Sequence, residues 1–159
     1  PVMKALNDIA EHRTIRLSLA GNISDHILEN IRKTAPKMDL DYKGYLTHKE
    51  AIALMKSGDL LLNFIFIGAD QDMISGKLLE YLASEVPVLS IGNPHSEAGK
   101  LLNLASFAQM IDAKDSHAQK SFIQEAIQQK GKDRNTMPDI QKWSRENIAV
   151  TLSNLLDKG

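Results

Sequence analysis

Residues 60–67 read LLLNFIFI and residues 74–92 read ISGKLLEYLASEVPVLSIG, and these two stretches decide the fold class. The first is a nearly unbroken apolar run of strand length, which is typical of a parallel strand buried on both faces. The second starts with small residues, continues at helical spacing, and ends in an apolar run over 87–91 that stops at a glycine. The order is strand, helix, strand, and we expect 60–67 to form the middle of a parallel sheet.

The same alternation continues on both sides of this segment. Upstream, the pattern predicts a helix over 1–12, a strand over 14–19, a helix from Ser24 or Asp25 to Pro36, a strand over 40–46, and a helix over 47–58 with a Thr47 and Glu50 capping box. Downstream, it predicts a helix over 96–104 capped by Ser96, a strand over 108–111, a helix over 116–129, and a surface helix over 138–158. We therefore predict a Rossmann-like α/β fold with a doubly wound parallel sheet, in one domain over 1–159, with its core in 1–134 and a terminal helical segment in 135–159.

Size and composition exclude several classes of protein. The 159 residues suit one domain, and 19 basic against 20 acidic residues leave no basic field that would favour nucleic acid as a partner. Cysteine is absent, which excludes disulfides and thiolate chemistry and is compatible with the cytoplasm. No apolar run reaches the ~20 residues of a membrane span. We expect a soluble cytoplasmic protein, and the start at Pro1 without an initiator Met favours truncation of a longer one.

The start of the helix predicted after Ser75 carries the candidate site. Ser75 and Gly76 let a ligand approach the backbone, the helix N-terminus offers unpaired N–H groups, and Lys77 adds a full positive charge. Glu80 lies about one turn further on the same face, where its carboxylate can accept two hydrogen bonds from a ribose diol. Together these residues predict a site for a nucleoside diphosphate.

A family resemblance agrees with this chemistry. GKLLEYLASEVPVLSIG at 76–92 resembles the segment around the second glutamate of the family-four retaining glycosyltransferases, and GYLTHKEAIALMKSGDLLLN at 44–63 resembles a second block of that family. The resemblance covers roughly residues 14–106. It implies the C-terminal, donor-binding domain of a bacterial two-domain GT-B enzyme, whose N-terminal acceptor domain and first strand would lie upstream of Pro1.

The resemblance also implies roles for particular residues. Glu80 would bind the ribose hydroxyls, Gly76 and Lys77 would meet the diphosphate, and Tyr45 and Leu46 would flank the base through backbone contacts. Lys77 and Glu80 would be the catalytic pair. The donor would be a nucleoside-diphosphate sugar, and the acceptor a glycan or lipid-linked molecule of cell-envelope polysaccharide synthesis. The full-length enzyme would need no cofactor or metal and could associate peripherally with the inner face of the cytoplasmic membrane.

Two departures from the family pattern stand out. The family's first glutamate falls on Asp72, which is one methylene shorter, so the role of Asp72 is open. The family's basic Arg and Lys pair would lie upstream of Pro1. The five histidines show no metal-ligand spacing, and we interpret Asp70-Gln71-Asp72 as a polar loop.

Two other functions remain open at this point. Sugar-nucleotide epimerases share this domain shape, and the donor-binding half barely distinguishes them from transferases. A non-catalytic flavodoxin-like regulatory domain would need an acidic cluster after its first strand and a phosphoacceptor aspartate at another strand end. The GKLLEYLAS block favours the transferase.

Overall fold

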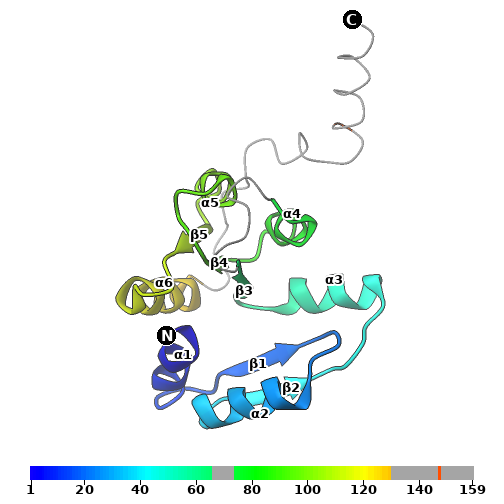
Figure 1. The fold of residues 1–159 in the computed structure, drawn as a ribbon, viewed down its shortest axis with the longest axis vertical. Helices are drawn as coiled ribbons and strands as arrows, with labels where there is room; N and C mark the ends of the chain where they lie inside the picture. The colour runs from blue at the N-terminus through cyan, green and yellow to red at the C-terminus, as the bar shows by residue number, and fades with distance from the viewer. Residues whose placement is uncertain (66–73, 130–146, 148–159) are drawn as a thin grey trace, which may run out of the picture.

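A computed structural model describes residues 1–65, 74–129 and 147, and it shows an α/β fold (Figure 1). Helices and strands alternate along the chain as the sequence predicts. Their order is α1 (Val2–Ile9), β1 (Arg16–Leu19), α2 (Asp25–Thr34), β2 (Asp39–Tyr42), α3 (His48–Ser57), β3 (Leu61–Phe64), α4 (Gly76–Ala83), β4 (Val88–Ile91), α5 (Glu97–Leu102), β5 (Ala108–Ile111) and α6 (Ser116–Gln128).

The strands form two small parallel sheets instead of one continuous sheet. β1 pairs with β2 in one sheet, and β3, β4 and β5 lie side by side in that order in the other. The expectation that 60–67 forms the middle of the sheet is therefore not met within this arrangement. β4 takes the middle position, and all of its residues are buried, whereas β3 lies at the edge. The general kind of fold is Rossmann-like, because parallel strands alternate with helices.

Helices cover the three-stranded sheet on both faces. One apolar cluster joins the sheet to α4 and α5 through Leu78, Leu82, Leu101 and Leu102, and Met55 of α3 packs against it. A second cluster joins the other face to α1 and α6 through side chains such as Leu6 and Ile123. In Figure 1, α1 and α6 lie next to each other beside this sheet. Because helices cover both faces of this sheet, the connecting loops lie at the ends of its strands.

Local signals explain where α3 begins and β2 ends. Thr47 accepts a hydrogen bond from the backbone N–H of Glu50, whose carboxylate in turn accepts from the backbone N–H of Thr47, which confirms the predicted capping box. β2 stops at Tyr42, short of the predicted end at 46. Gly44 has a φ of +66°, a left-handed conformation that ends the extended strand.

The predicted helix over 138–158 and the loop that holds Asp72 lie outside the described residues, apart from Asn147. Within the described ranges, no helix is both long enough and apolar enough to cross a membrane.

Candidate functional site at the start of α4

The N-terminus of α4 is fixed by Ser75. The Ser75 hydroxyl accepts a hydrogen bond of 3.2 Å from the Leu78 N–H, and the Ser75 carbonyl accepts from the N–H groups of Leu78 and Leu79. This cap uses the third and fourth N–H groups of the helix. The backbone N–H groups of Gly76 and Lys77, which come first, remain directed out of the helix end, as in any α-helix. The cap therefore leaves two N–H donors at this end for a ligand oxygen.

α4 has one buried face and one exposed face. Leu78 and Leu82 are fully buried against the sheet and α5. This anchoring turns Gly76, Lys77 and Glu80 toward solvent, where all three are exposed. The helical spacing of three and four residues puts them on neighbouring positions of one surface, as the sequence predicts.

The space above Gly76 is open. Among the residues that the structure describes, no heavy atom lies within 4 Å of a Cβ built on Gly76, and the φ of Gly76 is not in the left-handed region. The glycine is therefore not required by packing or by backbone conformation. Its lack of a side chain instead leaves the backbone approachable from solvent, which suits a bulky anionic ligand.

Tyr81 lies next to Glu80 and is half-buried. Burial raises the pKa of the Tyr81 phenol, and the charge of the Glu80 carboxylate raises it further. The phenol thus stays protonated at neutral pH. The neighbouring Glu80 carboxylate is on the solvent side of the helix, where it is available as a hydrogen-bond acceptor.

The loop between β4 and α5 caps the helix that follows it. The Ser96 hydroxyl accepts a hydrogen bond from the Gly99 N–H and donates one to the Asn93 carbonyl, so it caps α5. The Asn93 side chain accepts from the His95 N–H. Ser96 is buried, and its hydroxyl is used within the loop. This residue is a helix cap, as predicted.

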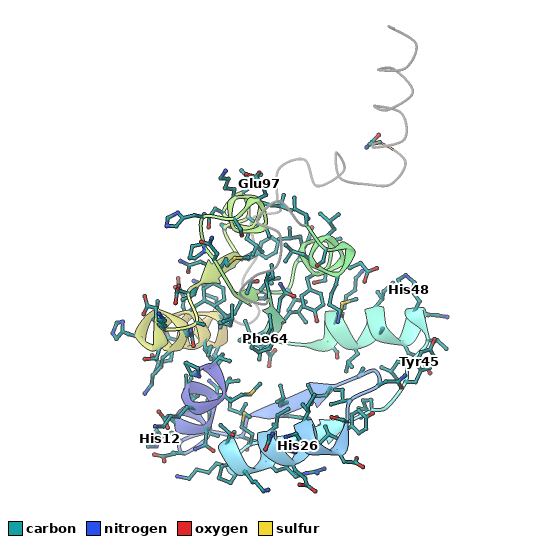
Figure 2. The ribbon with its side chains drawn as sticks, in the orientation of Figure 1. His12, His26, Tyr45, His48, Phe64 and Glu97 are labelled. Atoms are coloured by element: carbon teal, nitrogen blue, oxygen red, sulfur yellow. The ribbon has the colours of Figure 1, made fainter. Side chains whose placement is uncertain are left out.

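Tyr45 and Leu46 lie on a different part of the molecule, in the loop between β2 and α3. Tyr45 is 80% exposed, and Figure 2 shows it near His48, at the start of α3. The loop is tied to the end of β1 by a hydrogen bond of 2.7 Å from the Gly21 N–H to the Gly44 carbonyl, and Tyr42 donates to the Gly21 carbonyl at 2.9 Å. Both loops follow the carboxyl ends of their strands, as α4 follows β3.

The predicted site residues therefore fall into two groups. Ser75, Gly76, Lys77 and Glu80 share the first two turns of α4, whereas Tyr45 and Leu46 belong to the loop after β2. No hydrogen bond or ion pair joins the two groups among the described side chains. Asp72 lies outside the described residues, so its position relative to either group is open.

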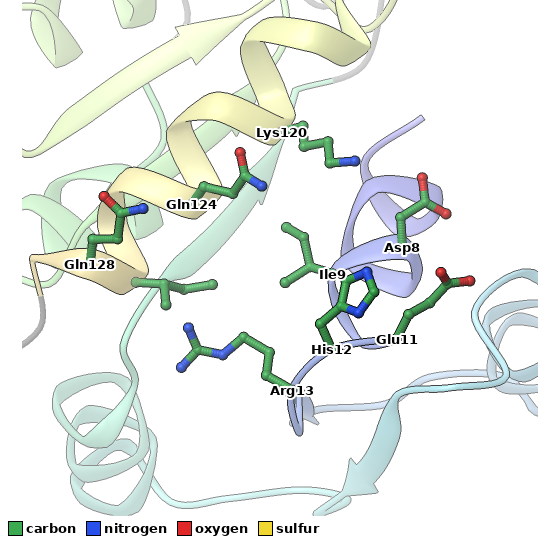
Figure 3. A pocket seen from close by; sticks show the side chains of 9 residues that line it. Asp8, Ile9, Glu11, His12, Arg13, Lys120, Gln124 and Gln128 are labelled. Atoms are coloured by element: carbon green, nitrogen blue, oxygen red, sulfur yellow. The ribbon is translucent and has the colours of Figure 1, made fainter.

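A hollow that sequence reasoning did not find lies elsewhere in the described part of the chain. A hollow of about 500 Å³ opens between α1 and α6, and Figure 3 shows its lining. Its charged and polar lining includes Asp8, Glu11, His12, Arg13, Lys120 and Gln124. Both signs of charge are present, and Glu11 is paired with Lys37, whose hydrogen bond and charge lower the pKa of the Glu11 carboxyl. This mixture favours no one class of ligand. Sequence periodicity gives no sign of this hollow, because its lining comes from α1 and α6, which are far apart in the sequence.

A second hollow, of about 250 Å³, lies between α6 and the residues before β4 and β5, including Pro87 and Phe107. The lining of neither hollow includes a residue of α4. Within residues 1–65 and 74–129, no group of three or more His, Asp or Glu side chains is arranged to hold a metal ion.

No protein-family model matches the chain, and no curated protein is significantly similar to it.

Proposed function

We propose that this chain is the nucleotide-sugar-binding domain of a retaining, metal-independent glycosyltransferase with the GT-B architecture. The observation that carries the proposal is the start of α4, where open backbone, a lysine and a glutamate share one solvent-facing surface after a strand end. Ligands of open α/β sheets bind outside the carboxyl ends of the strands. The family resemblance of 44–63 and 76–92 assigns the ligand class.

The first turn of α4 supplies the contacts for a diphosphate. The N–H groups of Gly76 and Lys77 can donate to phosphate oxygens, and the helix dipole places about half a positive charge at this end. The Lys77 ammonium adds a full charge on a flexible stem. Because Gly76 carries no Cβ and the described residues leave the space above it open, a phosphate can approach the backbone directly.

Glu80 supplies the contact for the ribose. Its carboxylate lies one turn beyond the phosphate position on the same surface, and a carboxylate can accept hydrogen bonds from both hydroxyls of a diol. The base would extend toward the loop that holds Tyr45 and Leu46, whose backbone would flank it. The nucleoside would thus lie across the ends of the strands.

The reaction needs little more from this half of the enzyme than stabilisation of the leaving group. In a retaining transfer the anomeric C–O bond breaks, and negative charge develops on the leaving diphosphate. Lys77 and the N-terminus of α4 stabilise that charge without a divalent ion. The proton and the acceptor hydroxyl would be handled by groups on the acceptor side.

Calorimetric titration of the chain with uridine, guanosine and adenosine diphosphates, and with the matching nucleosides, tests this proposal. We expect at least one diphosphate to bind in the micromolar to millimolar range, equivalent to about 4 to 8 kcal/mol. Lys77→Met and Glu80→Gln should weaken that binding. Lys56→Met, on the exposed side of α3, is a matched control for the loss of one lysine. Absence of binding by every diphosphate, or equal binding by parent and Lys77→Met, would contradict the proposal.

A further inference from the structure

The hollow of about 250 Å³ between α6 and the amino ends of β4 and β5 has a lining with one sign of charge. Among the described residues that line it, Glu125 is charged, and no lysine, arginine or histidine is present. The hollow between α1 and α6, in contrast, is lined by both signs. A concave surface with charges of one sign attracts ligands of the other sign. The smaller hollow therefore favours a cation over an anion.

The floor of this hollow is apolar and partly aromatic. Pro87, Phe107 and Ala126 are buried, and Phe122 is half-buried. Phe107 precedes β5 and Phe122 lies on α6, so rings from two elements line the same space. The face of a phenyl ring is negative and attracts a cation, and the attraction grows when the cation leaves water. The two rings thus add to the attraction that Glu125 exerts on a cation.

The rim of the hollow supplies hydrogen-bond acceptors. The side-chain amide of Gln129 donates a hydrogen bond of 2.9 Å to Oε1 of Glu125, which orients the carboxylate. Oε2 of Glu125 has no hydrogen-bond partner among the described residues. Further oxygens come from the exposed side chains of Asn103, Ser106 and Gln109. The rim can therefore accept several hydrogen bonds from one cationic ligand.

A strained acidic residue lies close to the same hollow. Glu85 has a φ of +58°, in the left-handed region that favours glycine. It comes two residues before Pro87, and two residues of chain span at most about 7 Å. Residues in costly backbone conformations are often found at functional sites. The exposed Glu85 side chain adds a second negative charge at this edge of the sheet.

The size of the hollow limits its ligand to a small group. Sites for drug-sized molecules measure about 300–1,000 Å³, whereas this one measures about 250 Å³. A guanidinium group has five N–H donors for the acceptors of the rim, and its flat surface stacks on aromatic rings. A lysine ammonium has three donors and is more strongly hydrated, so it loses more when it leaves water. The lining therefore favours a guanidinium over an ammonium group.

The hollow lies at the opposite edge of the sheet from the candidate nucleotide site. Pro87 and Phe107 come directly before β4 and β5, at the amino ends of these parallel strands. α4 follows β3 and therefore starts beyond the carboxyl end of that strand. A ligand in this hollow would leave the start of α4 open.

We propose that the hollow between α6 and the amino ends of β4 and β5 binds the guanidinium group of an arginine side chain from a partner polypeptide. The guanidinium donates to Oε2 of Glu125 and to oxygens of the rim, and its flat surface lies against the rings of Phe107 and Phe122. The inference is independent of the proposed nucleotide site.

Titration of the full chain with blocked amino acids tests this site. The probe is N-acetyl-arginine amide, and N-acetyl-citrulline amide is its neutral isostere. N-acetyl-lysine amide carries the same charge on an ammonium group. Binding is followed by NMR of the backbone amides, which identifies the residues that each compound perturbs.

We expect the arginine compound to bind in the millimolar range and to shift the amide signals of Phe107, Gln109, Phe122 and Gln129. The citrulline compound should bind at least tenfold more weakly, because it lacks the charge. The lysine compound should bind at least threefold more weakly. No binding of the arginine compound, shifts that avoid the lining residues, or equal binding of the arginine compound and either comparison compound would overturn the proposal.

Two variants separate the contribution of the charge from that of the rings. Glu125→Gln keeps the side-chain length and an acceptor for Gln129, and it should weaken binding of the arginine compound at least fivefold. Phe122→Leu keeps apolar volume without the ring, and it should weaken binding at least threefold. Thermal unfolding checks that both variants are folded.

Glu29→Gln is the matched control, since Glu29 is an exposed acid on α2 that pairs with Lys33. It should keep the affinity of the parent. Because Glu125 is exposed, its substitution tests the site even if Phe122→Leu does not fold. Parent affinity in Glu125→Gln, or the same loss in Glu29→Gln, would overturn the proposal.

Discussion

The side-chain amide of Asn63 in β3 donates a hydrogen bond of 2.8 Å to the hydroxyl of Ser90 in β4, and both residues are buried. The two residues are directly opposite each other in the parallel register. They are the polar residues of two otherwise apolar strands, and they can hydrogen-bond to each other only when β3 and β4 are in this register. A shift of one residue would leave both groups buried without each other, at a cost in free energy.

Removing either partner should therefore destabilise the fold. We expect Asn63→Ala and Ser90→Ala each to lower the free energy of unfolding by about 1–3 kcal/mol, because each leaves a buried polar group unpaired. Urea unfolding of both variants and of the double variant measures the coupling. If the two effects simply add, the hydrogen bond contributes nothing to stability.

Substitution by alanine should destabilise the fold at Gly99 and leave its stability nearly unchanged at Gly76. A Cβ on Gly99 would lie 2.4 Å from the Pro94 carbonyl oxygen, whereas a Cβ on Gly76 would have no atom of the described residues within 4 Å. Gly99→Ala should thus cost about 1–3 kcal/mol of stability. Gly76→Ala should change stability by less than about 0.5 kcal/mol. Thermal unfolding of the two variants checks both values.

The glycine pair also bears on the ligand. On the proposed function, Gly76→Ala should weaken binding of the diphosphate roughly tenfold while the fold stays intact, because the methyl group occupies the approach to the backbone. Titration of the folded variant measures this. Unchanged affinity would mean that the ligand does not contact the start of α4.

Lys77 and Glu80 should separate recognition of the phosphates from recognition of the ribose. We expect Lys77→Met to weaken a nucleoside diphosphate about tenfold or more, leave nucleoside binding nearly intact, and reduce the salt dependence of binding. Glu80→Gln should instead weaken nucleoside and diphosphate alike, by about tenfold, because it loses charge-assisted hydrogen bonds to the diol. Calorimetry at two salt concentrations distinguishes them. The same loss pattern in both variants would contradict these separate roles.

Divalent metal should not be needed for binding. Since Lys77 and the N-terminus of α4 supply the positive charge in the proposed site, titrations with EDTA and with added Mg²⁺ should give the same affinity within about twofold. An affinity that rises strongly with Mg²⁺ would favour a transferase that binds its donor through a metal ion.

The capping box of α3 should make stability depend on pH in the acidic range. The Thr47 hydroxyl and backbone N–H donate to the Glu50 carboxylate, and these bonds lower the pKa of Glu50 below its usual value of 4.5. A lowered folded-state pKa means that the stabilisation is complete above about pH 4.5 and is lost as the pH falls through the folded-state value. Glu50→Ala should have a smaller loss of Tm between pH 6 and pH 3 than the parent. An identical pH dependence in the two proteins would rule out this contribution.

Sequence by itself determined the order of helices and strands over the described residues, and the ends of several. The periodicities of 3.6 and 2 residues, the caps at Thr47 and Ser96, and the breaks at glycine are local signals, so they predicted α3, α4 and α5 closely. The exposed position of Gly76, Lys77 and Glu80 also followed from local spacing, because the buried leucines of α4 leave one surface for them.

Only the tertiary structure decided how the strands pair. An apolar run such as LLLNFIFI predicts a buried strand. Strand pairing, however, joins residues that are far apart in the sequence, so the run itself does not indicate which strands will lie beside it. β3 thus lies at the edge of its sheet and β4 at the centre. Asn63 of β3 lies opposite Ser90 of β4 and hydrogen-bonds to it. The distance between the loop of Tyr45 and the start of α4 was likewise decided only by the tertiary structure. It depends on how the two sheets pack, which is set by long-range contacts of α1 and α6 and by no short segment of the chain.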